Sequence, residues 1–506
     1  MRTKKALVNT ITSLMLQLTT IICGFIIPSL VIKTYGSGVN GLITSITQFL
    51  GFIVLLESGI GGVVRAALYK PLANKDIGTI SAIIKATEKI YKSIVFIFIV
   101  YLLIMTLFFP LIIEEFEGGF TASLVIIIGA STLAQYSFGI TYQLLLQADQ
   151  KRYVTSLFQI FTIIINTIMV VILIKIGTSI HIVRLVSTIV FIIRPIILSK
   201  YVKRNYSFDN SILPNKNAIK QRWDGLGHHI AYFLYNQTDV ILLTLVTNVK
   251  EVSVYSVYSM IVVGIKNIIS AFSSGVEAAF GNMLAKDEKE HLKHSFSTYE
   301  LFSTTLTTIF FTGTALLILP FVDVYTKGVE DVEYYRPLFA YILVAASAVY
   351  SIRLPYHYIT LAAGHFKQTR NGAFLEAGIN LIMSAILVNF LGIIGVAIGT
   401  FCSALFRTVQ YAIYTSKNIL DRSVWIFCKS FCLSIISSLL IIYITHMVPQ
   451  ISVTSYVDWC LYGSIILIIC IIVTSLINFI FFYNESIVIV NRLKNMMKIN
   501  KLFKKT

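Results

Sequence analysis

Long apolar segments of about 20 residues recur about fourteen times along this chain and constrain its fold more than any other feature. A helix needs about 20 apolar residues to cross the hydrocarbon core of a bilayer. Apolar and aromatic residues make up 56% of the 506 residues, and charged residues only 13%, about half the share of a soluble domain. A globular surface could not cover this much apolar area. The sequence therefore predicts an all-α integral membrane protein and excludes a cytosolic enzyme, a secreted disulfide scaffold and a disordered chain.

The apolar windows predict fourteen transmembrane helices with short connections. They cover approximately residues 7–32, 40–64, 93–113, 120–147, 153–174, 179–199, 227–246, 252–283, 299–321, 336–361, 370–390, 393–416, 425–446 and 457–483. Four basic segments, 2–5, 65–92, 200–222 and 485–506, carry the whole net charge of +17. Because Lys and Arg collect on the cytoplasmic side of membrane spans, we expect both termini in the cytoplasm.

The basic segments flank apolar spans, which favours anionic membrane lipids as neighbours and argues against nucleic-acid binding. Two connections are also amphipathic, and we expect both to lie in the cytoplasmic interface of the bilayer. Their apolar positions at helical spacing are Ile77, Ile80, Ile84 and Tyr91 in one, and Leu284, Leu292 and Phe296 in the other.

An internal repeat is indicated when the chain is aligned with itself at an offset of 212. The alignment places residues 66–68 on residues 278–280, and Glu88 on Glu300. Span one then falls on span seven in the same orientation, which predicts two pseudo-symmetric six-helix lobes and a C-terminal helix pair, an architecture typical of transporters. The predicted parts are an N-lobe (1–199), a basic cytoplasmic linker (200–226), a C-lobe (227–418), an accessory helix pair (419–484) and a basic cytoplasmic tail (485–506).

Polar residues follow one face of seven predicted spans at i, i+3 and i+4 spacing. A single Ser, Thr or Asn in a span usually joins helices, but stripes in both lobes predict a water-filled central cavity. The candidate substrate-binding residues are Lys266, Arg353, His357, Arg407, Arg65, Gln17 and Asn236.

Three carboxylates inside predicted spans, Asp239, Glu57 and Glu376, are candidates for ion coupling. Asp239 could bind a proton or Na⁺, or it could hold a cation in a structural ion pair. Glu57 lies about two turns from Arg65, and a structural pair between them is an equal alternative. Pro28 and Pro355 are expected to bend their spans, as in helices that line a moving gate.

No catalytic or cofactor-binding motif is present. The sequence contains no Walker loop, no HExxH and no GxSxG elbow. The function predicted from these residues is therefore not enzymatic, and no cofactor or metal is expected.

Several motifs carry a family resemblance that extends over essentially the whole chain. They are Tyr35–Leu42, Leu56–Gly59, Leu68–Leu72, Tyr235–Asp239 and Val254–Tyr258. With these motifs the chain resembles the polysaccharide flippases of the multidrug/oligosaccharidyl-lipid/polysaccharide exporter superfamily, the O-antigen and capsule repeat-unit transporters. The resemblance implies a lipid-linked oligosaccharide substrate on undecaprenyl diphosphate, alternating access, and a place beside polysaccharide polymerase and synthesis machinery.

A diphosphate head group needs cationic partners, for which Lys266, Arg353, Arg65 and Arg407 are the candidates. Coupling to H⁺ or Na⁺ as an antiporter is compatible with the carboxylates but is not required. Two other functions stay open at this point. One is an exporter of drugs or of other lipid precursors in the same superfamily, and the other is a membrane glycosyltransferase or polymerase.

Overall fold

The computed structural model describes residues 2–57, 59–209, 211–215, 226–273, 276–448 and 452–503. Every regular secondary-structure element of these residues is a helix. Thirteen helices or runs of joined helices among them are long and apolar enough to cross a membrane. The one remaining predicted span, 227–246, is also a helix, from Leu226 to Val246. Its described apolar part, Gln237–Val246, is shorter than the thirteen others. The all-α, multi-pass membrane fold predicted from the sequence is confirmed.

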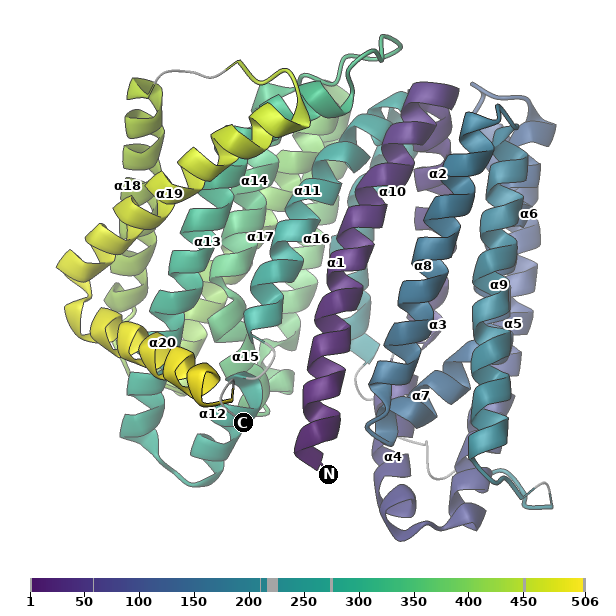
Figure 1. Ribbon diagram of the computed structural model, residues 1–506, viewed down its shortest axis with the longest axis horizontal. Coiled ribbons are helices and arrows are strands. Elements are labelled where there is room, and N and C mark those ends of the chain that lie inside the picture. Colours follow the sequence, from purple (N-terminus) through teal and green to yellow (C-terminus); the bar gives the residue numbers. More distant parts are fainter. Residues whose placement is uncertain are drawn as a thin grey trace. The chain divides into compact units, whose positions relative to one another are not determined.

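The chain forms two compact units (Figure 1). The first comprises Met1–Ser256 with Gly328–Val332, and the second comprises Val257–Lys327 with Glu333–Thr506. Elements of the first unit are α1 (Arg2–Tyr35), α2 (Ser37–Leu50), α3 (Ile53–Glu57), α4 (Ile60–Asn74), α5 (Ile77–Ile112), α6 (Gly118–Ala134), the π-helix η1 (Gln135–Gly139), α7 (Ile140–Ala148), α8 (Arg152–Lys175), α9 (Ile180–Asn205), α10 (Leu226–Val246) and the start of α11 (Val249–Ser273). Elements of the second unit are the rest of α11, α12 (Val276–Ala285), α13 (Lys289–Tyr325), α14 (Pro337–Ile352), α15 (Leu354–Ala362), α16 (Phe366–Leu391), α17 (Ile393–Asn418), α18 (Trp425–Met447), α19 (Tyr456–Phe481) and α20 (Tyr483–Phe503).

Helix boundaries repeat along the chain at a nearly constant offset. Helices α2 and α5 begin at positions 37 and 77, and α11 and α13 begin at positions 249 and 289, so both pairs differ by the offset of 212. Helices α8 and α16 begin at positions 152 and 366, and α9 and α17 begin at positions 180 and 393, so these offsets are only slightly larger. The offset found in the sequence therefore corresponds to a repeated order of helices, with a small insertion after α13.

Two spans that the sequence predicts as continuous are divided helices. Span 40–64 is divided among α2, α3 and α4, and α4 begins after Gly59, whose φ of +83° only glycine adopts without strain. Span 336–361 is divided between α14 and α15 beside Pro355, because proline cannot continue the helical hydrogen-bond ladder. Hydropathy does not reveal such breaks, since the residues on both sides remain apolar.

Protein packing covers most of the apolar face of each amphipathic connection, whereas Ile77 at the start of the first one is exposed. Ile80, Ile84 and Tyr91 are buried on the first turns of α5, which is one continuous helix of 36 residues. Leu292 and Phe296 are buried in the same way on α13. These buried positions contact the neighbouring short helices of their own unit, and the placement of both connections in the bilayer interface stays a prediction.

The start of α5 is fixed by a local cap. The Asp76 carboxylate accepts hydrogen bonds from the backbone N–H and the hydroxyl of Thr79, at 2.9 and 2.6 Å. These bonds favour the ionised carboxylate and lower the pKa of Asp76. They also satisfy a backbone donor that the first turn of a helix leaves without a partner.

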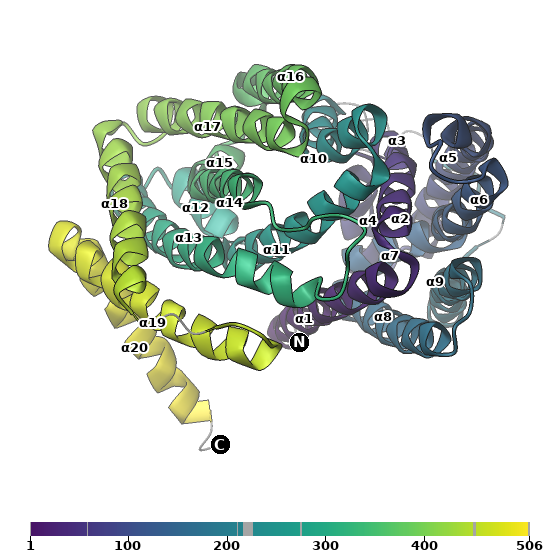
Figure 2. The same ribbon diagram turned by 90° about the horizontal axis from the view of Figure 1, so that it is seen from above.

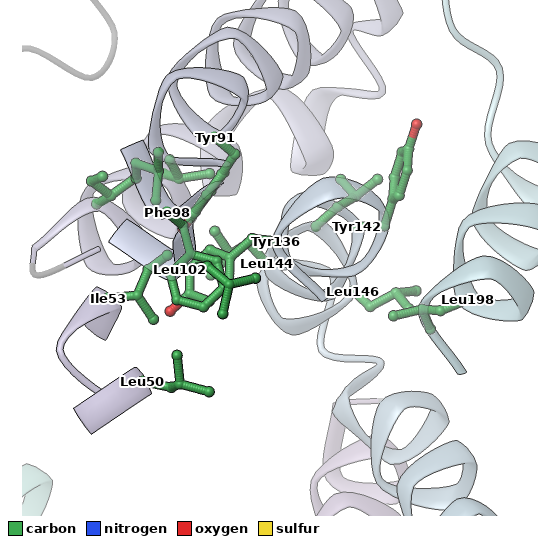
Figure 3. Close-up of a cluster of buried hydrophobic side chains, with 14 of the residues drawn as sticks. Leu50, Ile53, Tyr91, Phe98, Leu102, Tyr136, Tyr142, Leu144, Leu146 and Leu198 are labelled. Carbon is green, nitrogen blue, oxygen red and sulfur yellow. The ribbon is translucent and has the colours of Figure 1, made fainter. Parts of the chain in front are cut away.

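The core of the first unit is a cluster of large apolar side chains from α2, α5, α6, α7 and α9 (Figure 3). Phe49 and Phe109 meet edge to face with ring centroids 5.1 Å apart. Phe98 and Leu145 are almost completely buried. Residues of α7 belong to this core, so the core holds α7 against α5 and α9.

A polar seam joins α2 to α10 and to the start of α11 within the first unit. Asn40 donates to the Ser253 hydroxyl at 2.9 Å, and the Ser45 and Thr244 hydroxyls lie 2.7 Å apart. Next to them, a side chain on Gly41 would collide with the Val249 carbonyl, so glycine is needed for the close approach. These contacts explain why α10 and the start of α11 belong to the first compact unit.

Within the second unit, α14 lies between α13 and α17, with α15 below it along the same line (Figure 2). Helices α16 and α17 pack very closely, because a side chain on Gly395 or Gly399 would collide with the α16 backbone at Leu387 or Ser384. This packing brings polar groups of α14, α16 and α17 to one place.

Candidate substrate site

Arg353 occupies the one-residue break between α14 and α15. Its backbone is near-helical (φ −76°, ψ −15°), and Pro355 follows in the first turn of α15. The break turns the guanidinium into the second unit, where only 8% of the residue is exposed. A buried arginine of this kind requires a counter-charge.

Glu376 on α16 supplies that counter-charge and pairs with two arginines. Its Oε1 accepts from Arg353 Nη1, and its Oε2 lies 3.6 Å from Arg407 Nε on α17. Glu376 and Arg407 are 6% and 2% exposed. Two guanidinium groups therefore share one carboxylate inside a membrane-spanning unit.

Aromatic rings border the two arginines. The Tyr350 ring lies 4.2 Å from the Arg353 guanidinium, and the Tyr411 ring lies 4.1 Å from that of Arg407. Arg407 also donates to the Tyr411 hydroxyl at 2.9 Å. The rings stabilise the cations through their negative faces, and the donor edge of Arg407 faces oxygens of Glu376, Gln410 and Tyr411.

Lys266 and His357 lie next to the two tyrosines that border the arginines. The Lys266 ammonium on α11 lies 5.3 Å from the centroid of the Tyr350 ring. His357 Nδ1 on α15 lies 3.1 Å from the Tyr411 hydroxyl. With Arg353, Glu376 and Arg407 these side chains form what we call the arginine cluster: Lys266, Tyr350, Arg353, His357, Glu376, Arg407 and Tyr411.

The arginine cluster has a net charge of +2 with His357 neutral, since three cations face one carboxylate. It can attract an anion, and the anion would compete with Glu376 for the guanidinium groups. Gly372 on α16 makes room for this arrangement, because a β-carbon there would collide with Arg407 and Gln410.

Five of the ten candidates from the sequence are thus brought together by the fold. The remaining five belong to the first unit and lie on several different helices. They are Gln17 on α1, Glu57 on α3, Arg65 on α4, and Asn236 and Asp239 on α10. Gln17 is half-buried, and the side chain of Asn236 lies outside the described residues.

The two candidate coupling carboxylates of the first unit, Glu57 and Asp239, accept hydrogen bonds from tyrosines. Tyr136 donates to Glu57 at 2.8 Å, and Tyr91 lies 3.4 Å from the other oxygen. Tyr255 donates to the buried Asp239 at 2.7 Å. Arg65 donates to the amide oxygen of Gln147 at 2.9 Å, so its direct partner is not Glu57.

Sequence reasoning missed one buried charged group in the second unit. Arg422, in the loop between α17 and α18, pairs with Glu300 on α13 at 2.7 Å and donates to the Tyr356 hydroxyl at 3.2 Å. Burial alone would lower the pKa of Arg422, but Glu300 and Tyr356 outweigh it and raise the pKa. The match of Glu88 with Glu300 in the repeat was the one signal that could have pointed to it. Within the described residues, no group of three or more His, Cys, Asp or Glu could hold a metal ion.

Comparison with solved structures identifies the fold. The lipid II flippase MurJ in an inward closed conformation matches with a TM-score of 0.71 and 15% identity, over 94% of this chain and 99% of that one. An inward-facing multidrug resistance MATE family transporter of the MOP superfamily matches with a TM-score of 0.60 and 12% identity, over 81% and 98%. The Vibrio cholerae MATE transporter VcmN matches with a TM-score of 0.56 and 14% identity, over 83% and 98%.

The chain has the membrane fold of these flippases and transporters. A search of curated protein sequences gives no significant match. The family model described as "Polysaccharide biosynthesis protein" matches residues 6–280, which is more than half of the 506 residues. The chain therefore belongs to the polysaccharide biosynthesis protein family.

Proposed function

We propose that the protein moves undecaprenyl-diphosphate-linked oligosaccharide units from the inner to the outer leaflet of a bacterial plasma membrane by alternating access. The family and the fold support a role in carrying a lipid-linked substrate across the bilayer. Both termini are cytoplasmic in this proposal, because they are basic. O-antigen or capsule repeat units, delivered to a polymerase, are the proposed cargo.

The arginine cluster is the observation on which this proposal depends. A diphosphate offers several oxygens to planar guanidinium groups, and Arg353 and Arg407 share a single carboxylate. Lys266 adds a third cation at one end of the cluster. An organic cation, the substrate of many drug exporters, would be repelled by a site with this net charge.

Glu376 acts in the proposal as an exchangeable counter-ion. The arriving head group takes its place on Arg353 and Arg407, and Glu376 is then free to bind a proton. Asp239 and Glu57 are the other proposed coupling groups, since each is held by tyrosine hydroxyls that can adapt to either protonation state. An inside-negative potential helps as well, by about 4–5 kcal/mol per 100 mV for two negative charges that cross the whole field.

The experiment is transport of a defined undecaprenyl-diphosphate sugar in proteoliposomes. Arg353→Gln leaves Glu376 paired with Arg407, so the variant should fold. It should transport about tenfold more slowly or worse, because a charge-assisted hydrogen bond to the head group contributes about 1.5–3 kcal/mol. Lys175→Gln, at the exposed end of α8, removes the same charge elsewhere and should transport normally.

In cells, Lys266→Ala and Arg353→Ala should abolish surface polysaccharide while the protein remains in the membrane. Normal polymer from both variants would refute the proposed head-group site. Increased drug susceptibility of a deletion strain that still makes normal surface polysaccharide would instead favour the exporter.

A further inference from the structure

A polar pocket of about 630 Å³ lies in the first unit, where α5 begins and α9 ends. Its walls combine three cations, two carboxylates and three aromatic rings. The lining residues on which the argument depends are Lys85, Glu88, Tyr142, Lys203, Arg204 and Asp209. No part of the arginine cluster or of the proposed coupling groups belongs to it.

The segment that follows α9 forms one wall and is tied to α5 by hydrogen bonds. The Asp209 N–H donates to the Ser81 hydroxyl at 2.9 Å, and Lys85 donates to the Ile212 carbonyl at 2.9 Å. A third bond joins the Asn215 N–H to the Ala82 carbonyl at 3.2 Å. The pocket is therefore a built feature of the unit and not a gap beside a loose loop.

The floor of the pocket has a counterpart in the second unit. Glu88 lies eleven residues after the start of α5 at 77, and Glu300 lies eleven after the start of α13 at 289. Tyr142 and Tyr356 each lie six residues before the last residue of α7 (148) and α15 (362). Tyr142 donates to Glu88 at 2.9 Å, and Tyr356 donates to Glu300. The two halves of the repeat thus contain the same tyrosine–glutamate pair.

In the second unit this pair holds a cation from the chain itself. The Arg422 guanidinium contacts Glu300 and Tyr356, lies 3.5 Å from the Ser297 hydroxyl and sits 4.7 Å from the Phe296 ring. Its side chain is 7% exposed. Ser297 and Phe296 correspond, at the offset of 212, to Lys85 and Ile84 of the pocket.

By its distance from the preceding helix, Asp209 is the counterpart of this arginine in the first unit. Arg422 lies four residues after the end of α17 at 418, and Asp209 lies four after the end of α9 at 205. The Asp209 carboxylate accepts from the Ser211 N–H and hydroxyl, at 2.8 and 2.6 Å. The place that a guanidinium fills in one unit is therefore a pocket in the other, with the same Tyr–Glu floor.

The rim of the pocket is basic. Lys203 and Arg204 end α9 with exposed side chains, and the Lys203 ammonium lies 5.9 Å from the Tyr142 ring. The Tyr142 hydroxyl points away from the other labelled side chains of the apolar core (Figure 3). A ligand that pairs with both Glu88 on the floor and the basic rim carries a cationic and an anionic group.

We propose that this pocket binds a zwitterionic aminophosphate head group. Its ammonium meets the Glu88 carboxylate, as the Arg422 guanidinium meets Glu300 in the second unit, and its phosphate meets Lys203 and Arg204. Phosphatidylethanolamine of the basic, proposed cytoplasmic, leaflet is one source of this chemistry, and soluble phosphoethanolamine is the other. The inference does not depend on the proposed transport function.

Native mass spectrometry of the purified full-length protein tests the lipid source. The protein is offered equal amounts of phosphatidylethanolamine and phosphatidylglycerol with identical acyl chains. We expect the ethanolamine lipid to be retained about fivefold more, the size of effect expected for one half-exposed ion pair. Equal retention of the two lipids would overturn the lipid form of the proposal.

Two variants address the floor of the pocket. Glu88→Gln should reduce the ratio of retained phosphatidylethanolamine to retained phosphatidylglycerol to near one, because the ammonium loses its counter-charge. Asp209→Arg places an arginine where the second unit has Arg422, so it should fill the pocket and remove the bound lipid. Asp209→Arg also keeps the test decisive if Glu88→Gln does not fold. An undiminished preference in Asp209→Arg would refute the assignment of the pocket.

A third variant tests the rim, and a matched control removes the same number of positive charges elsewhere. Lys203→Gln with Arg204→Gln should weaken retention of both lipids. Lys89→Gln with Lys92→Gln removes two exposed charges of α5 outside the pocket and should change nothing. If the control lowers lipid retention as much as the rim variant, general charge attraction explains the binding and the proposal fails.

Phosphoethanolamine itself tests the soluble source, through the unfolding temperature of the delipidated protein in detergent. A stabilisation by millimolar phosphoethanolamine that Asp209→Arg abolishes would assign the pocket to the soluble compound. If neither phosphoethanolamine nor the lipid binds in a way that depends on Asp209→Arg, the proposal is wrong for both sources.

Discussion

At the scale of single residues, Glu376 is the shared counter-ion of two buried arginines, Arg353 and Arg407. Glu376→Gln leaves Arg353 and Arg407 as two like charges in a low-dielectric site, and removal of one partner from a buried pair typically costs about 3–5 kcal/mol. Arg353→Gln leaves a balanced pair and should cost clearly less. Thermal unfolding in detergent should therefore rank the wild type above Arg353→Gln, and Arg353→Gln above Glu376→Gln.

The double variant Arg353→Gln/Glu376→Gln provides the control. It contains one buried arginine in place of two, so it should be more stable than Glu376→Gln alone. If Glu376→Gln unfolds at the same temperature as the wild type, Glu376 is not the counter-ion that the geometry indicates.

At the scale of helices, the polar seam between α2 and α10 must open in any cycle that separates these helices. The Ser45 and Thr244 hydroxyls lie 2.7 Å apart and are buried, so two cysteines at these positions should be within disulfide range. In a background without the six native cysteines, oxidation of Ser45→Cys/Thr244→Cys should stop transport, and reduction should restore it. Ser45→Cys alone should be insensitive to oxidant. Full transport by the cross-linked protein would show that α2 and α10 stay together throughout the cycle.

At the scale of the whole molecule, the repeat is regular in its helices but unequal in its charges. Both halves contain the tyrosine–glutamate pair. Among the residues that the structure describes, an arginine, Arg422, pairs with Glu300 and none pairs with Glu88. Arg422→Gln should destabilise the protein by about 3–5 kcal/mol, because Glu300 would remain buried without its cation. Hydrogen exchange should rise at residues 289–300 and stay unchanged at residues 77–88, which serve as the internal control. Equal changes in both segments would show that the Arg422 contact is not local to the second unit.

Much of the fold follows directly from local composition. Segments of about 20 apolar residues must be helices in a bilayer, because every backbone group has to be hydrogen-bonded internally. Arg353, Glu376 and Arg407 could also be singled out from the sequence, because ionisable residues are costly and rare in membrane spans. The repeat offset of 212 was also visible in the sequence before the helix boundaries reproduced it.

What the tertiary structure alone decided is which groups meet. Arg353, Glu376 and Arg407 lie on three different elements, and their pairing depends on the crossing of α16 and α17 at Gly395 and Gly399. The periodicity of the α5 start marked an apolar face but could not say whether lipid or protein would cover it. Hydropathy and periodicity are properties of neighbouring residues, whereas an ion pair, a polar seam or a pocket depends on distances between segments far apart in the chain.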